Sequence, residues 1–217
     1  RLEKTRQGVF KTIESKLAVK GKTLIRRFED ISKHLKQHQE NEAAVVAMEK
    51  FKSNVIIERA HLNDGIYDTF DKVYFLINSD HISGDELIKV TKQLHSWPYL
   101  LELDMDAADN NHRRERNAME DRLRDQRTRF ESQMEYHLEN IEKFMQNSKL
   151  TLYATTMADV ERFEQLIEQL DEEMDDITAR ENMLFNFASS FDQYVQIKDD
   201  LLPYLEMWHA VNRFMTE

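Results

Sequence analysis

The chain has 217 residues, of which 33% are charged and 41% are hydrophobic, and its formal net charge at pH 7 is -11. Only 2 prolines and 4 glycines occur, which leaves little room for the turns that hairpin-rich or βαβ folds require. The absence of cysteine excludes disulfides and thiolate chemistry, and no run approaches the roughly 18 apolar residues of a membrane-spanning helix.

The first 77 residues predict two long amphipathic helices, because apolar side chains recur at steps of three and four. The first spans about residues 2–38, and its stripe is formed by Phe10, Ile13, Leu17, Leu24, Phe28, Ile31 and Leu35. The second spans about residues 41–77, where we expect a kink at Gly65; its stripe is formed by Ala44, Met48, Phe51, Val55, Leu62, Ile66, Phe70, Val73 and Ile77.

The first helix contains Gly21-Lys22-Thr23, the last letters of a phosphate-binding loop. That loop, G-x-x-x-x-G-K-[ST], requires a glycine at position 16, where this chain has Lys16, and it requires a strand before it. The surrounding pattern is helical instead. The sequence therefore predicts a helix that contains a glycine, with no nucleotide site.

The middle of the chain predicts a turn over residues 78–84 and then a long helix. Ser83-Gly84-Asp85-Glu86 has the pattern of a capping box, so a short helix is expected to run to about His95 and to end at Trp97-Pro98. From Pro98 to about residue 147 no helix breaker occurs, which predicts about 75 Å of continuous helix.

The last third of the chain predicts two more helices. Thr156 to Asp159 resembles a cap, and a heptad-like seam follows, formed by Val160, Phe163, Ile167, Leu170, Met174, Ile177 and Leu184. Ser189-Ser190 marks a break. The final segment, with Pro203 near a helix start or a kink, contains Phe191, Tyr194, Ile197, Leu201, Leu205, Trp208, Val211 and Met215.

These patterns predict an all-α fold, an elongated antiparallel helical bundle or two bundles in series with long heptad-patterned helices. Its expected parts are an N-terminal bundle (1–97), a long connecting helix (98–147) and a C-terminal helical part (148–217). Both chain ends fall within helical patterns, so we expect an internal piece of a longer polypeptide. Residues 1–36 hold 11 Lys/Arg against 4 Asp/Glu, and residues 159–182 hold 2 against 10, which favours lateral pairing or two solvated faces.

Several short patterns resemble metal sites, but each has a simpler explanation. Glu58/His61 and Glu206/His209 are E-x-x-H pairs such as di-iron bundles use, yet about one such pair is expected by chance from the composition. The stretch from Asp104 to Glu115 lacks the glycine of a calcium loop, and His34 and His38 are expected at the surface. No catalytic, cofactor-binding or metal-binding residue is predicted, and the di-iron bundle remains a remote alternative.

Seven arginines cluster on the long helix and form a candidate docking surface: Arg113, Arg114, Arg116, Arg122, Arg124, Arg127 and Arg129. Acidic residues are interleaved with them at helical spacing, which indicates local ion pairs, and no aromatic platform for nucleic acid accompanies them. Net negative charge disfavours binding to an anionic membrane. We therefore expect a solvated or protein-docking face.

The C-terminal third resembles the dynein heavy chain where the helical tail leads into the linker. The similar stretches are "ITARENMLF", with Arg180-Glu181 after an acidic helix, and "FDQYVQIKDDLLPYLEMWHAVNRFM"; upstream, "SWPYLLEL" before a long charged helix is also similar. The resemblance is closer to axonemal than to cytoplasmic heavy chains. The family often has a glycine-containing turn where this chain has Asn186-Phe187-Ala188, and leucine where it has Met207.

The resemblance implies a non-catalytic tail segment that joins the anchored base to the force-producing linker. ATP sites and microtubule contacts would lie elsewhere in the parent motor, and intermediate or light chains, or another heavy chain, would be partners. The implied location is the cytoskeleton of the cilium or flagellum axoneme, with the cytoplasm as alternative. Expected packing residues are Trp208, Tyr204, Pro203, Phe191, Trp97 and Pro98. A spectrin-like rod or adaptor remains the alternative function.

Overall fold

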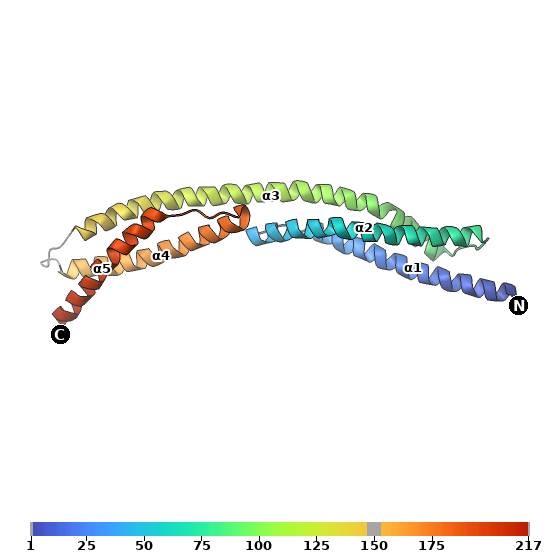
Figure 1. The fold of residues 1–217 in the computed structure, drawn as a ribbon, viewed down its shortest axis with the longest axis horizontal. Helices are drawn as coiled ribbons and strands as arrows, with labels where there is room; N and C mark the ends of the chain where they lie inside the picture. Colours follow the sequence, from blue (N-terminus) through green and yellow to red (C-terminus); the bar gives the residue numbers. More distant parts are fainter. Residues whose placement is uncertain (1, 147–152, 217) are drawn as a thin grey trace. The chain divides into compact units, whose positions relative to one another are not determined.

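The computed structural model describes residues 2–146 and 153–216, and five helices account for nearly all of them. No strand occurs in these two ranges, which confirms the predicted all-α class. The helices are shown in Figure 1, and their bounds are α1 Leu2–Leu35, α2 Glu42–Asn78, α3 Asp85–Met145, α4 Tyr153–Phe185 and α5 Asp192–Thr216. In the described parts of the chain, no helix is both long and apolar enough to span a bilayer.

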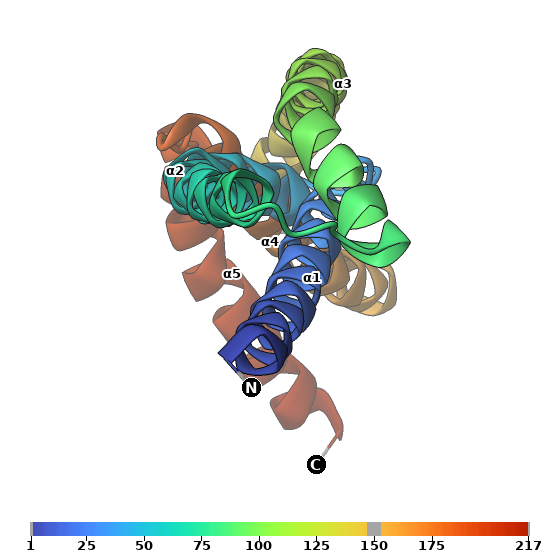
Figure 2. The same ribbon diagram turned by 90° about the vertical axis from the view of Figure 1, so that its right-hand side faces the viewer.

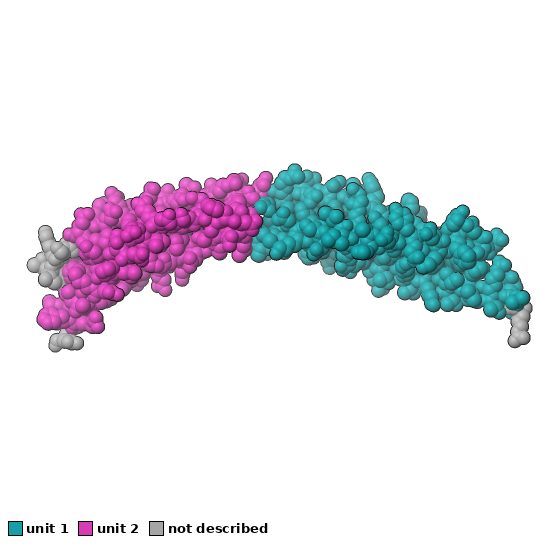
Figure 3. Space-filling view, viewed as in Figure 1, with its two compact units in different colours: residues 1–116 teal, residues 117–217 magenta. Residues whose placement is uncertain are grey.

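The chain divides into two compact units, residues 1–116 and residues 117–217 (Figure 3). Unit 1 contains α1, α2 and the first part of α3, and unit 2 contains the rest of α3 with α4 and α5. Within each unit, successive helices run antiparallel, as short connections favour (Figure 1).

The larger of two apolar clusters in unit 1 is a core to which all three of its helices contribute. These helices are seen end-on in Figure 2. The apolar stripes predicted for the first two helices supply two walls of this core. The third wall comes from the start of α3. The buried residues are Ile25, Phe28, Ile31, Leu35, Met48, Val55, Leu62, Ile66, Val90, Leu94, Leu101 and Ala108.

Two glycines mark places where the helices of unit 1 approach closely. A Cβ atom on Gly21 would overlap Val90 Cγ1 and lie 3.1 Å from Leu94 Cδ1. The close approach of α1 and α3 therefore requires a residue without a side chain at this position. A Cβ atom on Gly65 would lie 3.0 Å from Leu24 Cδ2, and α2 continues as a helix through this position. The glycine of the Gly-Lys-Thr letters therefore serves helix packing.

The prediction that a helix ends at Trp97-Pro98 is wrong, because α3 runs from Asp85 to Met145 with Pro98 inside it. Proline removes one backbone hydrogen bond and crowds the preceding turn, but tertiary packing can outweigh that cost. Trp97 stacks on buried Phe28, with ring centroids 5.7 Å apart and planes 12° apart. The Trp97 ring is thus packed against α1 at the turn of α3 where Pro98 predicts the end of a helix.

The starts of α2 and α3 are held by different kinds of contact. Asn41 caps α2, because its side chain accepts a hydrogen bond from the Ala44 backbone N–H at 2.9 Å. The predicted capping box at Ser83 is wrong: the Ser83 hydroxyl is buried and has no hydrogen-bond partner. The N–H of Gly84 instead donates to Glu14 Oε1 of α1 at 2.6 Å, which ties the loop before α3 to the bundle.

Glu14 also contacts His81 in the same loop, with 2.9 Å between Oε2 and the ring nitrogen Nε2. This hydrogen bond, aided by the one from Gly84, holds the pKa of the Glu14 carboxyl below its ordinary value despite partial burial. One carboxylate therefore fixes a six-residue connection between α2 and α3.

Unit 2 is built on the seams predicted for the last third of the chain. Its buried apolar residues come from α3, α4 and α5; they include Leu123, Phe130, Leu138, Ile141, Val160, Phe163, Leu170, Ile177, Leu184, Tyr194, Leu201 and Trp208. The helix start predicted at Thr156 is wrong, because the structure is already helical from Tyr153 and the Thr156 side chain is buried. The predicted break at Ser189-Ser190 is confirmed, since α4 ends at Phe185 and α5 begins at Asp192.

A substitution at Gly21 tests the close approach of α1 and α3. Gly21→Ala is expected to lower the free energy of unfolding of unit 1 by about 1–2 kcal/mol, because overpacking outweighs the gain in helix propensity. Urea unfolding is followed by Trp97 fluorescence in a Trp208→Phe background, so that the signal reports unit 1 alone.

Gly8 provides the matched control, because a Cβ atom there meets nothing within 4 Å. Gly8→Ala is expected to raise the stability by about 0.5–1 kcal/mol. Equal stabilisation by both substitutions would contradict the packing described at Gly21.

Candidate functional site

The α4–α5 junction of unit 2 is the candidate functional site, because the Arg180-Glu181 letters of the resemblance lie there. These two successive residues of α4 meet two successive residues of α3. Arg180 donates to Gln126 Oε1 at 2.7 Å, and Arg127 Nη1 lies 3.6 Å from Glu181 Oε1. Arg180 and Glu181, which are adjacent in the sequence, thus connect α4 to α3 through polar contacts.

Glu181 is the buried member of this pair, with only 4% of its surface exposed. Its Oε2 atom accepts a hydrogen bond from the Ser189 backbone N–H at 2.7 Å, and its Oε1 atom accepts one from the Ser189 hydroxyl at 3.0 Å. A buried carboxylate requires such partners, since an unpaired one would be strongly destabilising. Glu181 therefore fixes the path of the chain between α4 and α5.

The turn after Phe185 uses a left-handed residue. Asn186 has φ 52, and its N–H donates to the carbonyl of Asn182 at 3.1 Å, which closes the last turn of α4. Glycine is the usual residue at such a helix end, and asparagine is the best tolerated substitute. Asn186 can thus supply the backbone geometry that a glycine-containing turn would supply.

Beyond this turn, the start of α5 is anchored by aromatic residues. Phe191 is buried and packs edge to face on Phe130 of α3, with ring centroids 5.3 Å apart. Tyr194 is 1% exposed, and its hydroxyl lies 2.9 Å from Asp171 Oδ1 and 3.2 Å from the carbonyl oxygen of Ile167. Asp171 Oδ2 in turn accepts from Lys198 Nζ at 2.5 Å. Burial, followed by the hydrogen bond to Asp171, raises the pKa of Tyr194.

The expected packing residues differ in burial. Trp208 and Phe191 are buried, and Trp97 and Pro98 are half-buried. Tyr204 is 40% exposed and Pro203 is also exposed, so they are not the anchors of α5. The buried tyrosine is Tyr194, one of the seam residues. Because α5 begins at Asp192, Pro203 lies in the interior of the helix and not near its start.

The seven arginines of the candidate docking surface divide between the units. In unit 1, Arg116 lies 3.1 Å from Glu49, whereas Arg113 and Arg114 are exposed. In unit 2, Arg124 lies 3.3 Å from Asp121 and Arg127 lies 2.8 Å from Glu131, while Arg122 and Arg129 are exposed seven residues apart. Within the described residues, the side chains of Arg113, Arg114, Arg122 and Arg129 make no ion pair or hydrogen bond.

The residues that resemble the end of a phosphate-binding loop, Lys22 and Thr23, contact groups of helices α1 and α3. Lys22 forms an ion pair with Glu86, and the Thr23 hydroxyl donates to the Val19 carbonyl at 3.1 Å. Both residues lie in the interior of α1.

The E-x-x-H pairs have other partners as well. Glu58 binds Arg27, and His209 Nε2 lies 2.6 Å from Glu164 Oε1. Glu58 and His61 belong to unit 1, whereas Glu206 and His209 belong to unit 2. Across residues 2–146 and 153–216, no group of three or more His, Asp or Glu side chains is arranged to hold a metal ion.

The calcium-like stretch is also helical. Asp104 and Glu115 both lie within α3, where Asp104 accepts from Ser32 at 2.5 Å and Glu115 binds the backbone N–H of Gln39 at 3.1 Å. His34 and His38 are exposed, as expected; His38 contacts Glu115. Asp104 thus joins α3 to α1, and Glu115 joins α3 to the connection between α1 and α2.

The two charged bands find partners inside their own units. Basic residues of α1 pair with α2 and α3: Lys20 lies 2.5 Å from Asp68, and Lys36 lies 2.9 Å from Asp104. Acidic residues of α4 pair within unit 2, as Asp171 does with Lys198. Most of these pairs are exposed, so they orient the helices more than they stabilise them.

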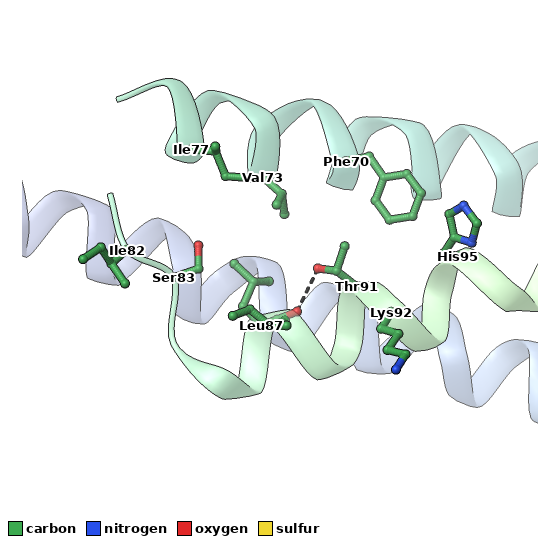
Figure 4. A pocket seen from close by; sticks show the side chains of 10 residues that line it. Phe70, Val73, Ile77, Ile82, Ser83, Leu87, Thr91, Lys92 and His95 are labelled. Carbon is green, nitrogen blue, oxygen red and sulfur yellow. Dashed lines mark hydrogen bonds between the residues drawn. The ribbon is translucent and has the colours of Figure 1, made fainter. Parts of the chain in front are cut away.

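Sequence reasoning missed an apolar groove in unit 1. It has a volume of about 640 Å³ and lies between the end of α2, the loop before α3 and the first turns of α3 (Figure 4). Its lining residues are Phe70, Val73, Ile77, Ile82, Ser83, Leu87, Ile88, Thr91, Lys92 and His95. Ile77, Ile82 and Ile88 are more than half exposed, which is unusual for isoleucine on a charged helix bundle.

No protein-family model matches this sequence, and no curated protein sequence matches it at a significant level.

A substitution at Glu181 tests the junction. Glu181→Gln is expected to lower the stability of unit 2 by about 1–3 kcal/mol, because an amide cannot accept both hydrogen bonds from Ser189 and loses the attraction of Arg127. Trp208 fluorescence during urea unfolding, in a Trp97→Phe background, gives the free energy.

Glu172 is the matched control, since it lies on the same helix and is exposed. Glu172→Gln is expected to change the stability by less than about 0.5 kcal/mol. Equal effects of the two glutamine variants would show that Glu181 does not hold the junction.

Proposed function

We propose that this chain is a non-catalytic segment of a dynein heavy chain tail, located where the tail leads into the linker. In this role it transmits force between the anchored base and the linker and offers surfaces to accessory chains. The parent protein is then a microtubule motor of the axonemal type, with its ATP sites and microtubule contacts outside these residues.

The observation that carries the proposal is that three residues of the resemblance, Arg180, Glu181 and Trp208, also hold unit 2 together, although Pro203 and Tyr204 of the same stretch are exposed. Arg180 and Glu181 bridge α4 to α3 and to the α4–α5 connection, and Trp208 is 2% exposed on α5. Asn186 adopts a left-handed conformation at the place where the family often has glycine. Residues with such structural contacts are a stronger basis for the resemblance than exposed residues without contacts would be.

The mechanical role is supported by the way the helices are packed. Packed protein interiors have low compressibility, so a displacement at one end of a bundle passes along it with little loss. Within unit 2, the Glu181–Ser189 contacts and the Phe130–Phe191 pair fix the connection between α4 and α5. Such a fixed connection suits a segment under load better than a mobile linker would.

The accessory partners belong to the same proposal. The exposed, unpaired arginines Arg122 and Arg129 of unit 2 lie seven residues apart, which places them on one side of α3. They suit an acidic protein surface, such as an intermediate or light chain or another heavy chain could offer. The axoneme of a cilium or flagellum is the corresponding location.

The coding sequence around this chain tests the proposal directly. A reading frame that continues after Glu217 into a linker and then into P-loop modules is the expected result. A continuation into further three-helix repeats would instead establish the rod alternative. As a second measurement, the purified 217-residue chain is expected to show no ATP turnover above a buffer blank, and turnover that saturates with ATP would contradict a non-catalytic segment.

A further inference from the structure

We infer that the groove between α2 and α3 of unit 1 binds an amphipathic helix of another polypeptide, about four turns long, with carboxylates along the edge that faces α3. This inference depends on the geometry of unit 1 alone. Its failure would leave the proposed motor assignment unchanged.

The groove is longer than the part shown in Figure 4. A second cavity, lined by Asn63, Ile66, Tyr67, Phe70, His95 and Pro98, shares Phe70 and His95 with the first. The two cavities adjoin at the Phe70 and His95 rings, which stack with centroids 6.3 Å apart, and we call the two cavities together the trough. From Asn63 to Ile77 the α2 wall covers 15 residues, or about 21 Å of helix, which matches about four turns of a bound helix.

The side chains that line the two cavities include residues at the spacing of a helix-packing seam. On α2 these are Asn63, Ile66, Phe70, Val73 and Ile77, at steps of three, four, three and four. On α3 they are Ile88, Thr91, His95 and Pro98, at steps of three, four and three. Such spacing on two neighbouring helices is what a further helix needs in order to insert its own apolar stripe.

Several apolar residues in or beside the trough are exposed. Tyr67 and Tyr74 are each 66% exposed, Ile77 is 58% exposed and Ile88 is 55% exposed. On α2 they form a second apolar stripe beside the one that faces the core. A helix with two apolar stripes is typical of a bundle position that has neighbours on both sides.

Two buried polar atoms belong to residues that line the trough. They are the Ser83 hydroxyl at the first cavity and Asn63 Oδ1 at the second, and neither has a hydrogen-bond partner. Buried polar atoms without a partner are costly and uncommon.

The charges beside the trough differ between its two edges. On α3, Lys92 lines the groove and Lys89 lies one turn before it; both are exposed and make no ion pair with the described residues. On α2, Asp64 and Asp71 are exposed and likewise make no ion pair with described residues. A helix with glutamates on one edge and lysines on the other therefore complements the trough, and one with lysines on both edges does not.

The test uses two synthetic helical peptides with the same leucine stripe. The matched peptide has glutamates along one edge and lysines along the other, and the mismatched peptide has lysines along both. Each carries a fluorophore, and its anisotropy is measured while the 217-residue chain is titrated in low salt. The matched peptide is expected to bind at least about tenfold more tightly than the mismatched one.

Variants of the chain locate the binding site. Ile77→Lys is expected to weaken binding of the matched peptide at least about tenfold, because it places a charge on the apolar wall. Ile57→Lys is the control, since Ile57 is 64% exposed on the same helix and lies outside both cavities. Replacing Lys89 and Lys92 by glutamate is expected to reverse the preference between the peptides, whereas Lys50→Glu, at an exposed position away from the trough, leaves it unchanged.

Three results would overturn the inference. The first is no saturable binding of either peptide up to about 1 mM. The second is binding that Ile77→Lys and Ile57→Lys weaken equally, which would indicate an unspecific apolar contact. The third is self-association of the chain in sedimentation velocity that Ile77→Lys abolishes, because the occupant of the groove would then be a second copy of this chain.

Discussion

Mutual burial of apolar stripes is the constraint on which this structure depends. With few turns, no disulfide and about a third of its residues charged, the chain can remove apolar surface from water only by packing helix against helix. Each unit does so with three helices. Three other residues serve this arrangement. Gly21 allows the close approach of α1 to α3, and Glu14 and Glu181 bind the segments that connect successive helices.

Two carboxylates, the half-buried Glu14 and the buried Glu181, have similar tasks in the two units. Glu14 binds the N–H of Gly84 before α3, and Glu181 binds the N–H of Ser189 before α5. In both cases a carboxylate on one helix satisfies a backbone donor of a connecting segment, which fixes where the next helix begins. Such contacts stabilise little when exposed, but when buried they specify one path of the chain over others.

Much of the fold could be predicted from the sequence, because a period of 3.6 residues is a strong signal over long stretches. The class and the seams followed from that signal, and the break was predicted from the Ser189-Ser190 pair. The break at Pro98 did not occur, since stacking of Trp97 on Phe28 is a tertiary effect that local rules do not contain. The groove was missed because the apolar residues of α2 that line it, such as Phe70, Val73 and Ile77, were assigned in the sequence to the stripe that faces the core.

The helical content of α4 as an isolated peptide, residues 153–185, tests the central claim most directly. If burial against α3 and α5 supplies most of its stability, circular dichroism of the monomeric peptide at neutral pH will show a largely unfolded chain. The acidic run from Asp171 to Asp176 adds like-charge repulsion to that expectation. A monomeric peptide that is fully helical on its own would contradict the account.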